Sequence, residues 1–234
     1  MAILATNEFL TALKSLYPRL PVVQNPWYLV AAVTFSASNR PEEVPNVFRY
    51  VLGDLKDEGN DSESNRFVVA RRFRESILQS GLLCGYARSI NSLIALNEIT
   101  PEELREKDGV LRNVDQHLDG YTRRGKELFL SMYGDTSDSI RTLLYGTYPD
   151  LGWFCDTVGY GVVYGGTNVL SQVETSYVIA TANIAMDTPR QVGWHLKNAQ
   201  NGGATIDQVK AVREIAMEVS EKAGITWRDG VPEI

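Results

Sequence analysis

Apolar residues recur at steps of three and four along most of the chain, which is the spacing of one buried face of an α-helix. In the segment that begins near Pro41, this face consists of Val44, Val47, Phe48, Val51 and Leu55. Residues 67–96 follow the same rule, and Gly81 and Gly85 predict a break or a close helix crossing there. The pattern therefore predicts an all-α protein.

Three tetrapeptides have the form of a capping box, in which Thr accepts a hydrogen bond in the first turn of a helix and a Glu or Gln reaches back to it. They are Thr100–Glu103, Thr188–Gln191 and Thr205–Gln208. The second predicts a helix over about residues 189–200 whose apolar face holds His195. We therefore expect His195 to point inward.

The strongest candidate for a strand is Val158–Tyr164, yet Gly159 and Gly161 weaken a strand interior. One short strand also has no partner with which to form a sheet. We interpret residues 149–166 as an aromatic-rich helix that leads into a glycine turn.

Composition narrows the classes of function. The chain has 234 residues and a net charge of -6, with 23 Lys and Arg against 29 Asp and Glu. It has no dense basic stripe of the kind that neutralises phosphates, so we expect no nucleic-acid partner. No apolar run approaches the roughly 18 residues of a membrane span, so we expect no membrane partner either.

Cysteine usage bears on the compartment. The chain has two cysteines, Cys84 and Cys155, which argues against a disulfide scaffold and fits a reducing environment. The C-terminal Val-Pro-Glu-Ile is neither a peroxisomal nor a retention address. We expect a cytoplasmic protein, with an organelle such as the mitochondrion or peroxisome as the alternative.

Two stretches share a layout of helix, turn and Thr-capped helix. Arg88–Leu93 precedes Thr100, and Gln191–Leu196 precedes Thr205. The layout indicates either an old duplication or a chance recurrence of helix caps, which are common signals.

The second of these stretches carries a family resemblance. The run Glu174–Val209, which contains Gln191–Leu196 and Asn198–Thr205, resembles the carboxymuconolactone decarboxylase and alkyl hydroperoxidase D-like superfamily. Arg74–Leu93 resembles the divergent first repeat of its two-repeat eukaryotic, especially fungal, members. The resemblance covers about residues 67–225 and is strongest after residue 148.

This resemblance implies an alkyl hydroperoxidase D-like helical fold with two degenerate repeats. The expected division is an N-terminal helical extension (1–60), a divergent first repeat (61–146) and a carboxymuconolactone decarboxylase-like second repeat (147–234). Such proteins usually assemble as symmetric oligomers, so a homo-oligomer is expected.

The candidate chemistry centres on His195, one of two histidines in the chain, because an imidazole can transfer protons near neutral pH. Glu174 lies 21 residues earlier (195 minus 174), a separation that allows two antiparallel helices to bring the side chains together. The resemblance implies that this pair converges, with Gln191, Trp194 and Asn201 shaping the substrate pocket.

Each of the two has a structural alternative. His195 can be a core histidine that hydrogen bonds to the backbone, and Glu174 can be an ordinary first-turn acid that interacts with the helix dipole. His117 lies in a charged stretch and is expected at the surface.

A redox role depends on the cysteines. In the redox branch of the resembled family, two cysteines three residues apart precede the His, but Thr188 and Gln191 occupy those positions here. In the first repeat Cys84 is present, whereas Ala87 and Asn91 replace its partners. Cys84 is therefore either a redox residue or, like many free cysteines, a small buried apolar side chain.

The leading hypothesis is a cofactor-independent acid/base enzyme, a decarboxylase-like lyase acting on a small organic acid or lactone through His195 and Glu174. No cluster of His, Asp, Glu or Cys has metal-ligand spacing, so we expect neither a metal nor a cofactor. Two alternatives stay open: a peroxide-reducing or redox-sensing alkyl hydroperoxidase D-like protein acting through Cys84, and a non-catalytic helical oligomerisation scaffold.

Overall fold

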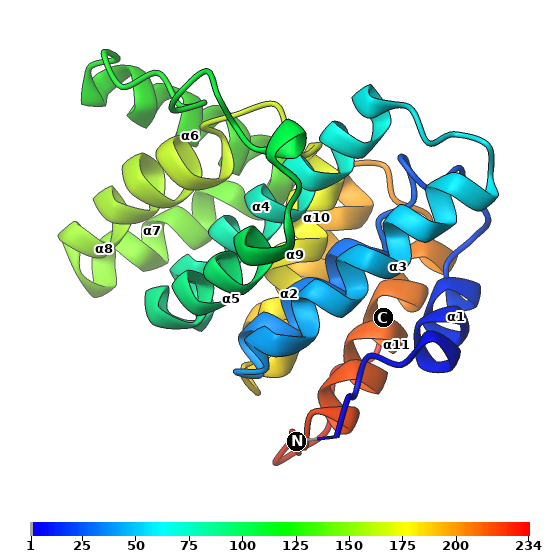
Figure 1. The fold of residues 1–234 in the computed structure, drawn as a ribbon. Helices are drawn as coiled ribbons and strands as arrows, with labels where there is room; N and C mark the ends of the chain where they lie inside the picture. The colour runs from blue at the N-terminus through cyan, green and yellow to red at the C-terminus, as the bar shows by residue number, and fades with distance from the viewer. Residues whose placement is uncertain (1) are drawn as a thin grey trace.

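The structure is a computed structural model that describes residues 2–234, and within that range it contains helices and no strand (Figure 1). The all-α prediction is confirmed. The α-helices are α1 (Asn7–Leu16), α2 (Trp27–Ala37), α3 (Val44–Asp57), α4 (Glu63–Cys84), α5 (Tyr86–Ile99), α6 (Leu118–Tyr133), α7 (Ser137–Thr147), α8 (Pro149–Phe154), α9 (Gln172–Ala185), α10 (Pro189–Asn201) and α11 (Ile206–Lys222). The 3-10 helices are η1 (Pro41–Glu43), η2 (Glu102–Leu104) and η3 (Gly134–Thr136), and η4 (Cys155–Tyr164) is a π-helix.

Two helices form the centre of the molecule, α2 and α9. Every residue of α2 is buried, as is every residue of α9 from Thr175 to Ala185. A helix that is apolar all round must be covered on all sides, and α2 and α9 pack against each other and are both covered by α4 and α11. No helix in the described residues is both long and apolar enough to cross a bilayer.

Residues 2–60 take part in this main core. The apolar face predicted for α3 is buried, and α1 packs against α2, α3 and α11. The segment expected as an N-terminal extension thus supplies the central helix α2. The division into repeats at 61–146 and 147–234 stays a prediction.

A second, smaller core lies between α6, α7 and η4 and is rich in tyrosine. It consists of Phe129, Met132, Tyr133, Ile140, Tyr160, Tyr164 and Ile179. The helices α6 and η4 cross closely, because a side chain on Gly125 would overlap the backbone oxygen of Asp156 and one on Gly161 would overlap that of Tyr121. These glycines therefore fix the approach of the two helices.

Several local predictions are confirmed. Residues 149–166 are helical through α8 and η4, and end in the predicted glycine turn. Gly85 separates α4 from α5 with a φ of 100°, a conformation that glycine adopts without strain. Thr205 forms the predicted capping box with Gln208.

Two of the predicted capping boxes are wrong. The Thr188 hydroxyl donates to the backbone and side-chain oxygens of Asn183 (3.1 and 2.7 Å) and does not cap α10. The Thr100 hydroxyl donates to Leu96 at the end of the preceding helix (2.7 Å), and only a 3-10 turn follows. In both cases the hydroxyl bonds back to the preceding helix, a local contact that Thr side chains often form. A capping box that the sequence interpretation missed joins Ser171 to Glu174.

Candidate functional site

A pocket of about 890 Å³ opens between α4, α6, the start of α9, the connection that precedes α6 and the loop that follows η4. This volume lies in the range of small-molecule sites. We call it the arginine pocket. Its walls include three arginines, Arg71, Arg72 and Arg124, and the loop residues 165–170.

One wall of the arginine pocket rests on a buried ion pair between Arg72 of α4 and Glu174 of α9. Arg72 is 5% exposed, and its guanidinium donates to the Glu174 carboxylate and to the backbone oxygen of Val23. It also lies 5.5 Å from the centre of the Tyr28 ring, a cation–π arrangement. The pair therefore links three segments that are distant in sequence.

Glu174 also has a local structural role. Its second carboxylate oxygen accepts the backbone N–H of Ser171 (2.9 Å), and the Ser171 hydroxyl accepts the backbone N–H of Glu174 (3.2 Å). The first-turn acid that the sequence offered as an alternative is thus present. Its neighbours Gln172 and Thr175 line the arginine pocket, so Glu174 stands at the pocket wall.

The three arginines differ in how far their charges are compensated. Arg71 is paired with Glu106 (2.6 Å), and Arg72 with Glu174. Arg124 donates to the neutral amide oxygen of Gln116 (3.0 Å) and is in no ion pair with a residue of the described chain. The arginine pocket therefore presents a guanidinium that a bound anion can neutralise.

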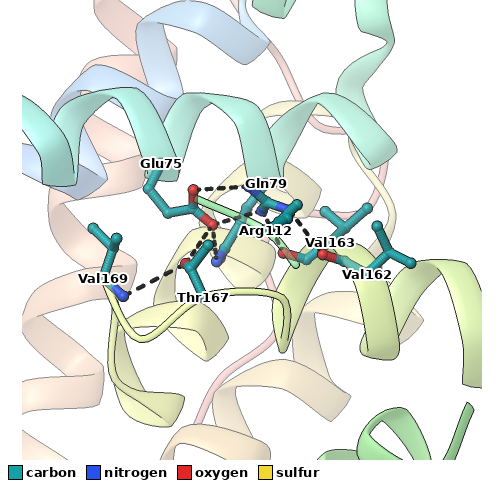
Figure 2. Close-up of polar contacts among 7 residues, drawn as sticks. All are labelled: Glu75, Gln79, Arg112, Val162, Val163, Thr167 and Val169. Carbon is teal, nitrogen blue, oxygen red and sulfur yellow. Dashed lines mark hydrogen bonds and ion pairs between the residues drawn. The ribbon is translucent and has the colours of Figure 1, made fainter. Parts of the chain in front are cut away.

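A second buried ion pair, behind the pocket loop, joins Glu75 of α4 to Arg112 of the connection between η2 and α6 (Figure 2). Glu75 is 4% exposed and accepts from Arg112 Nη2 (2.7 Å), Gln79 (3.1 Å) and Thr167 (3.1 Å). Arg112 also donates to the backbone oxygens of Val162 and Val163 at the end of η4 (2.8 and 2.9 Å).

His195 lies elsewhere, in the small tyrosine-rich core. As predicted, it points inward from α10, and it is 4% exposed. The Asn198 amide is oriented with its nitrogen donating to the backbone oxygens of Met132 (3.1 Å) and Trp194 (3.0 Å). Its oxygen then faces His195 Nδ1 at 3.4 Å, so that this nitrogen carries the proton.

The other ring nitrogen, His195 Nε2, then accepts from the Tyr133 hydroxyl (3.4 Å), which in turn accepts from the Tyr160 hydroxyl (3.2 Å). Burial lowers the pKa of His195 to about 3 and raises that of Tyr133 to about 12. Burial also raises the pKa of Tyr160. All three groups are therefore neutral at pH 7.

The structure does not join the two predicted catalytic residues by a hydrogen bond. Glu174 is engaged by Arg72 and Ser171, whereas His195 is engaged by Tyr133 and Asn198. His195 is not among the residues that line the arginine pocket. The ring of Tyr164 lies between the two regions, because it lines the pocket and meets the Tyr160 ring edge-on at 5.3 Å.

The three predicted substrate-binding residues lie on α10 near His195. The Trp194 ring meets Tyr133 edge-on at 6.3 Å. The Asn201 amide donates to the backbone oxygen of Met132 (2.8 Å), one of the last carbonyls of α6. Gln191 lies in the first turn of α10 and is half-buried. None of the three lines the arginine pocket.

Cys84 ends α4 in a buried position, 7% exposed, with its sulfur 4.0 Å from the Ser80 hydroxyl. Burial raises the pKa of its thiol, which disfavours the thiolate that redox chemistry needs. Within residues 2–234, no group of three or more His, Cys, Asp or Glu side chains is placed to hold a metal ion.

Sequence reasoning missed the arginine pocket. The sequence does not distinguish the arginines of this site from others in a charged helical protein. In particular, the spacing of Arg72, Arg112 and Arg124 does not indicate a binding site. A usable signal was the pair Gly165-Gly166 directly after an aromatic-rich helix, since such loops often lie beside ligands.

The chain is similar to two fungal proteins. It is 29% identical over 269 aligned residues to Peroxisomal protein 2 of Saccharomyces cerevisiae, covering 92% of this chain and 94% of that protein. It is also 29% identical over 204 aligned residues to Peroxisomal protein 2 of Schizosaccharomyces pombe, covering 87% of this chain and 90% of that one. No model of a known protein family matches the chain, and no solved structure does.

Proposed function

We propose that this chain is a peroxisomal protein that binds a small organic acid or lactone in the arginine pocket and transforms it by acid/base chemistry without a cofactor, as a carboxymuconolactone decarboxylase-like enzyme. The peroxisomal part is supported by the names of the two similar yeast proteins. Co-localisation of a fluorescently tagged chain with a peroxisomal marker in fungal cells tests it.

The observation that carries the substrate class is the uneven charge of the arginine pocket. Arg124 lines it without a carboxylate partner, and Arg72 lines it with one. A carboxylate is the natural ligand of a guanidinium, because the two groups form parallel hydrogen bonds. A small acid bound to Arg124 would therefore bring its reacting carbons close to the pair formed by Arg72 and Glu174.

Glu174 is the proton-transfer group in this proposal. A second anionic group of the ligand can take the place of Glu174 on Arg72, which leaves the Glu174 carboxylate free to accept a proton from carbon. In an isomerisation, the same proton returns to a different carbon of the same molecule. Glu174 thus ends the cycle in the state in which it began.

His195 has a supporting role in the same scheme. It is neutral and buried, and its hydrogen bonds to Tyr133 and Asn198 tie α10 to the end of α6. The catalytic role that the resemblance implies for His195 requires the substrate or water to reach it. The His195→Gln variant separates the two roles: a fall in kcat without loss of folding assigns chemistry to His195.

The test uses the purified protein and a panel of small keto acids, hydroxy acids and lactones. Calorimetry measures binding and mass spectrometry measures conversion. We expect Arg124→Leu to weaken binding of the accepted ligand by about tenfold or more, the effect of losing a charge-assisted hydrogen bond. The matched control is Arg123→Leu, because Arg123 is the exposed neighbour on α6 and does not line the pocket.

Glu174→Gln should lower kcat by about 10²–10⁴, the usual contribution of a general base. Equal effects of Arg124→Leu and Arg123→Leu, or full turnover in Glu174→Gln, would contradict the proposal.

A non-catalytic scaffold is the second candidate. It is favoured by the burial of His195, whose pKa of about 3 removes it from proton transfer near neutral pH. If the protein is a scaffold, no acid or lactone of the panel binds to it, and the Arg124→Leu variant gives the same calorimetric result as the parent protein. The redox alternative through Cys84 lacks a specific observation in its favour, since the thiol is buried and its pKa is raised.

A further inference from the structure

The connection between η2 and α6, residues 105–117, contains no helix and contributes to one wall of the arginine pocket. We call it the strap. Leu111 and Asn113 of the strap line the pocket. Val110 and Val114 are 72% and 73% exposed, so this middle part of the strap buries few apolar side chains. Its position is therefore not fixed by a hydrophobic contact.

Polar contacts attach the strap instead. Near its start, Glu106 accepts from Arg71 (2.6 Å) and Arg74 (3.0 Å) of α4. Near its end, the backbone oxygen of Asn113 accepts from the Tyr121 hydroxyl (2.6 Å) of α6. Gly109 lies between these points with a φ of 86°, in the region that favours glycine.

The strongest attachment is the ion pair between Arg112 and Glu75 shown in Figure 2. Arg112 reaches from the strap past the end of η4, where it binds two backbone oxygens, to the buried carboxylate on α4. The Thr167 hydroxyl donates to the same carboxylate (3.1 Å). Thr167 belongs to the loop that forms another wall of the pocket. One carboxylate therefore holds both the strap and the pocket loop.

We propose that the strap is a lid over the arginine pocket and that Arg112 is its latch. Release of Arg112 from Glu75 moves Leu111 and Asn113 away from the pocket. It also loosens the loop at Thr167, because the Glu75 carboxylate loses the cation that orients it. Opening breaks polar contacts and exposes little apolar surface, so it proceeds without unfolding of the helices.

The lid rests on the proposed function in one respect, that the arginine pocket is where a ligand binds. Its test measures access to the pocket and uses neither ligand nor turnover. A failed lid test therefore leaves the proposed function standing, and a failed binding screen leaves the lid testable.

The experiment places a thiol inside the pocket. Thr175 lines the pocket and is 2% exposed, so the Thr175→Cys variant, made in a Cys155→Ser background, presents a thiol that iodoacetamide reaches only through the pocket. The rate of alkylation at position 175 is read by mass spectrometry. Arg112→Leu should raise this rate by about tenfold or more, because it removes the ion pair with Glu75 and both hydrogen bonds to the end of η4.

The matched control is Arg105→Leu. Arg105 is on the same strap but lies outside the pocket lining; it pairs with the exposed Glu102 and donates to the backbone oxygen of Asn97 (3.3 Å). These contacts are at the start of the strap and do not involve Leu111 or Asn113, so loss of Arg105 should leave the rate unchanged. A second opening variant, Glu106→Gln, weakens the exposed attachment and leaves the latch in place. We expect about a twofold to threefold increase for it, in line with a surface ion pair.

Hydrogen exchange supplies the readout that a merely structural role would not give. In Arg112→Leu, faster exchange should appear in residues 105–117 and 165–170 and not in α2 or α11. The lid is wrong if neither Arg112→Leu nor Glu106→Gln speeds alkylation. It is also wrong if the buried native Cys84 becomes alkylated at the same increased rate, because the whole core would then have loosened.

Discussion

The arginine pocket and the tyrosine-rich core around His195 are stabilised by different kinds of contact. The pocket walls are held by charged pairs, Arg72 with Glu174 and Arg112 with Glu75. Around His195 itself the contacts are neutral hydrogen bonds and stacked rings, such as Phe129 on Tyr133 at 4.2 Å, although an ion pair between Arg141 and Asp156 (2.8 Å) also joins α7 to η4. The first region consists of ion pairs, whereas in the second burial lowers the pKa of His195 to about 3 and keeps its imidazole neutral.

The comparison teaches where acid/base chemistry can occur in this fold. The resemblance implies one site that contains both Glu174 and His195. In the structure Glu174 is bound to the pocket-lining Arg72, whereas His195 is buried in the tyrosine-rich core, although both helices belong to the same bundle. Two residues touch both regions: Tyr164 lines the pocket and its ring contacts Tyr160, and Leu128 lines the pocket and packs against the tyrosine-rich core.

The largest effect is expected when the buried ion pair between Arg72 and Glu174 at the pocket wall is broken. Arg72→Met leaves the Glu174 carboxylate without its cation, and Glu174 is only 17% exposed. Removing one partner of a buried pair is strongly destabilising, so we expect a loss of about 3 kcal/mol in the free energy of unfolding. Urea denaturation followed by circular dichroism measures it.

Arg71→Met is the control for that variant. Arg71 is the preceding residue on α4, and its ion pair with Glu106 is 30% and 21% exposed at the two side chains. Solvent screens such a pair, so its loss should cost less than about 1 kcal/mol. Equal losses in the two variants would show that burial does not distinguish the two ion pairs.

The second prediction concerns the pH dependence of stability, which arises from His195 in the tyrosine-rich core. The pKa of His195 is lowered from its ordinary 6.5 to about 3 in the folded protein. Between these values the unfolded chain binds a proton that the folded chain does not, so stability falls as pH falls from 6.5 towards 3. From pH 6.5 to pH 5 the loss is about 2 kcal/mol, at about 1.4 kcal/mol per unit.

His195→Gln should remove this part of the pH dependence, measured by urea denaturation at pH 6.5 and pH 5. His117, the other histidine, is exposed at the start of α6 as the sequence indicated, and His117→Gln is the matched control. An unaltered slope in His195→Gln would mean that the imidazole reaches water in the native protein.

The sequence predicted the fold better than it predicted the site, for a physical reason. Helices can be predicted from the local spacing of apolar residues. The sequence therefore predicted the buried face of α3, the inward position of His195 and the break at Gly85. The capping rule failed for Thr100 and Thr188, because each hydroxyl donates back to a residue at the end of the preceding helix and accepts no N–H from the turn that follows.

The site depended on contacts between distant segments. Arg72 meets Glu174 across 102 positions, and Arg112 meets Glu75 across 37. No local pattern records such pairings in a single sequence. The resemblance identified Glu174 as a residue of interest, yet it did not identify the arginine that determines the environment of that carboxylate.

The smallest expected effect is a difference in stability between variants of two tyrosines in the tyrosine-rich core. The Tyr160 hydroxyl donates to Tyr133, whereas the Tyr164 hydroxyl is buried without a hydrogen-bond partner among the described residues. Tyr160→Phe removes a buried hydrogen bond and should lower the free energy of unfolding by about 1 kcal/mol. Tyr164→Phe removes only an unsatisfied hydroxyl and should be neutral or slightly stabilising.

The two variants are matched in chemistry, since each loses one oxygen from a ring of η4, and urea denaturation at pH 7 compares them directly. A loss in Tyr164→Phe as large as that in Tyr160→Phe would mean that the Tyr164 hydroxyl has a partner in solution. That partner would have to be water or a ligand admitted through the arginine pocket, because the Tyr164 ring lines it. The two regions would then be connected, and proton transfer between the pocket and His195 would regain a physical route.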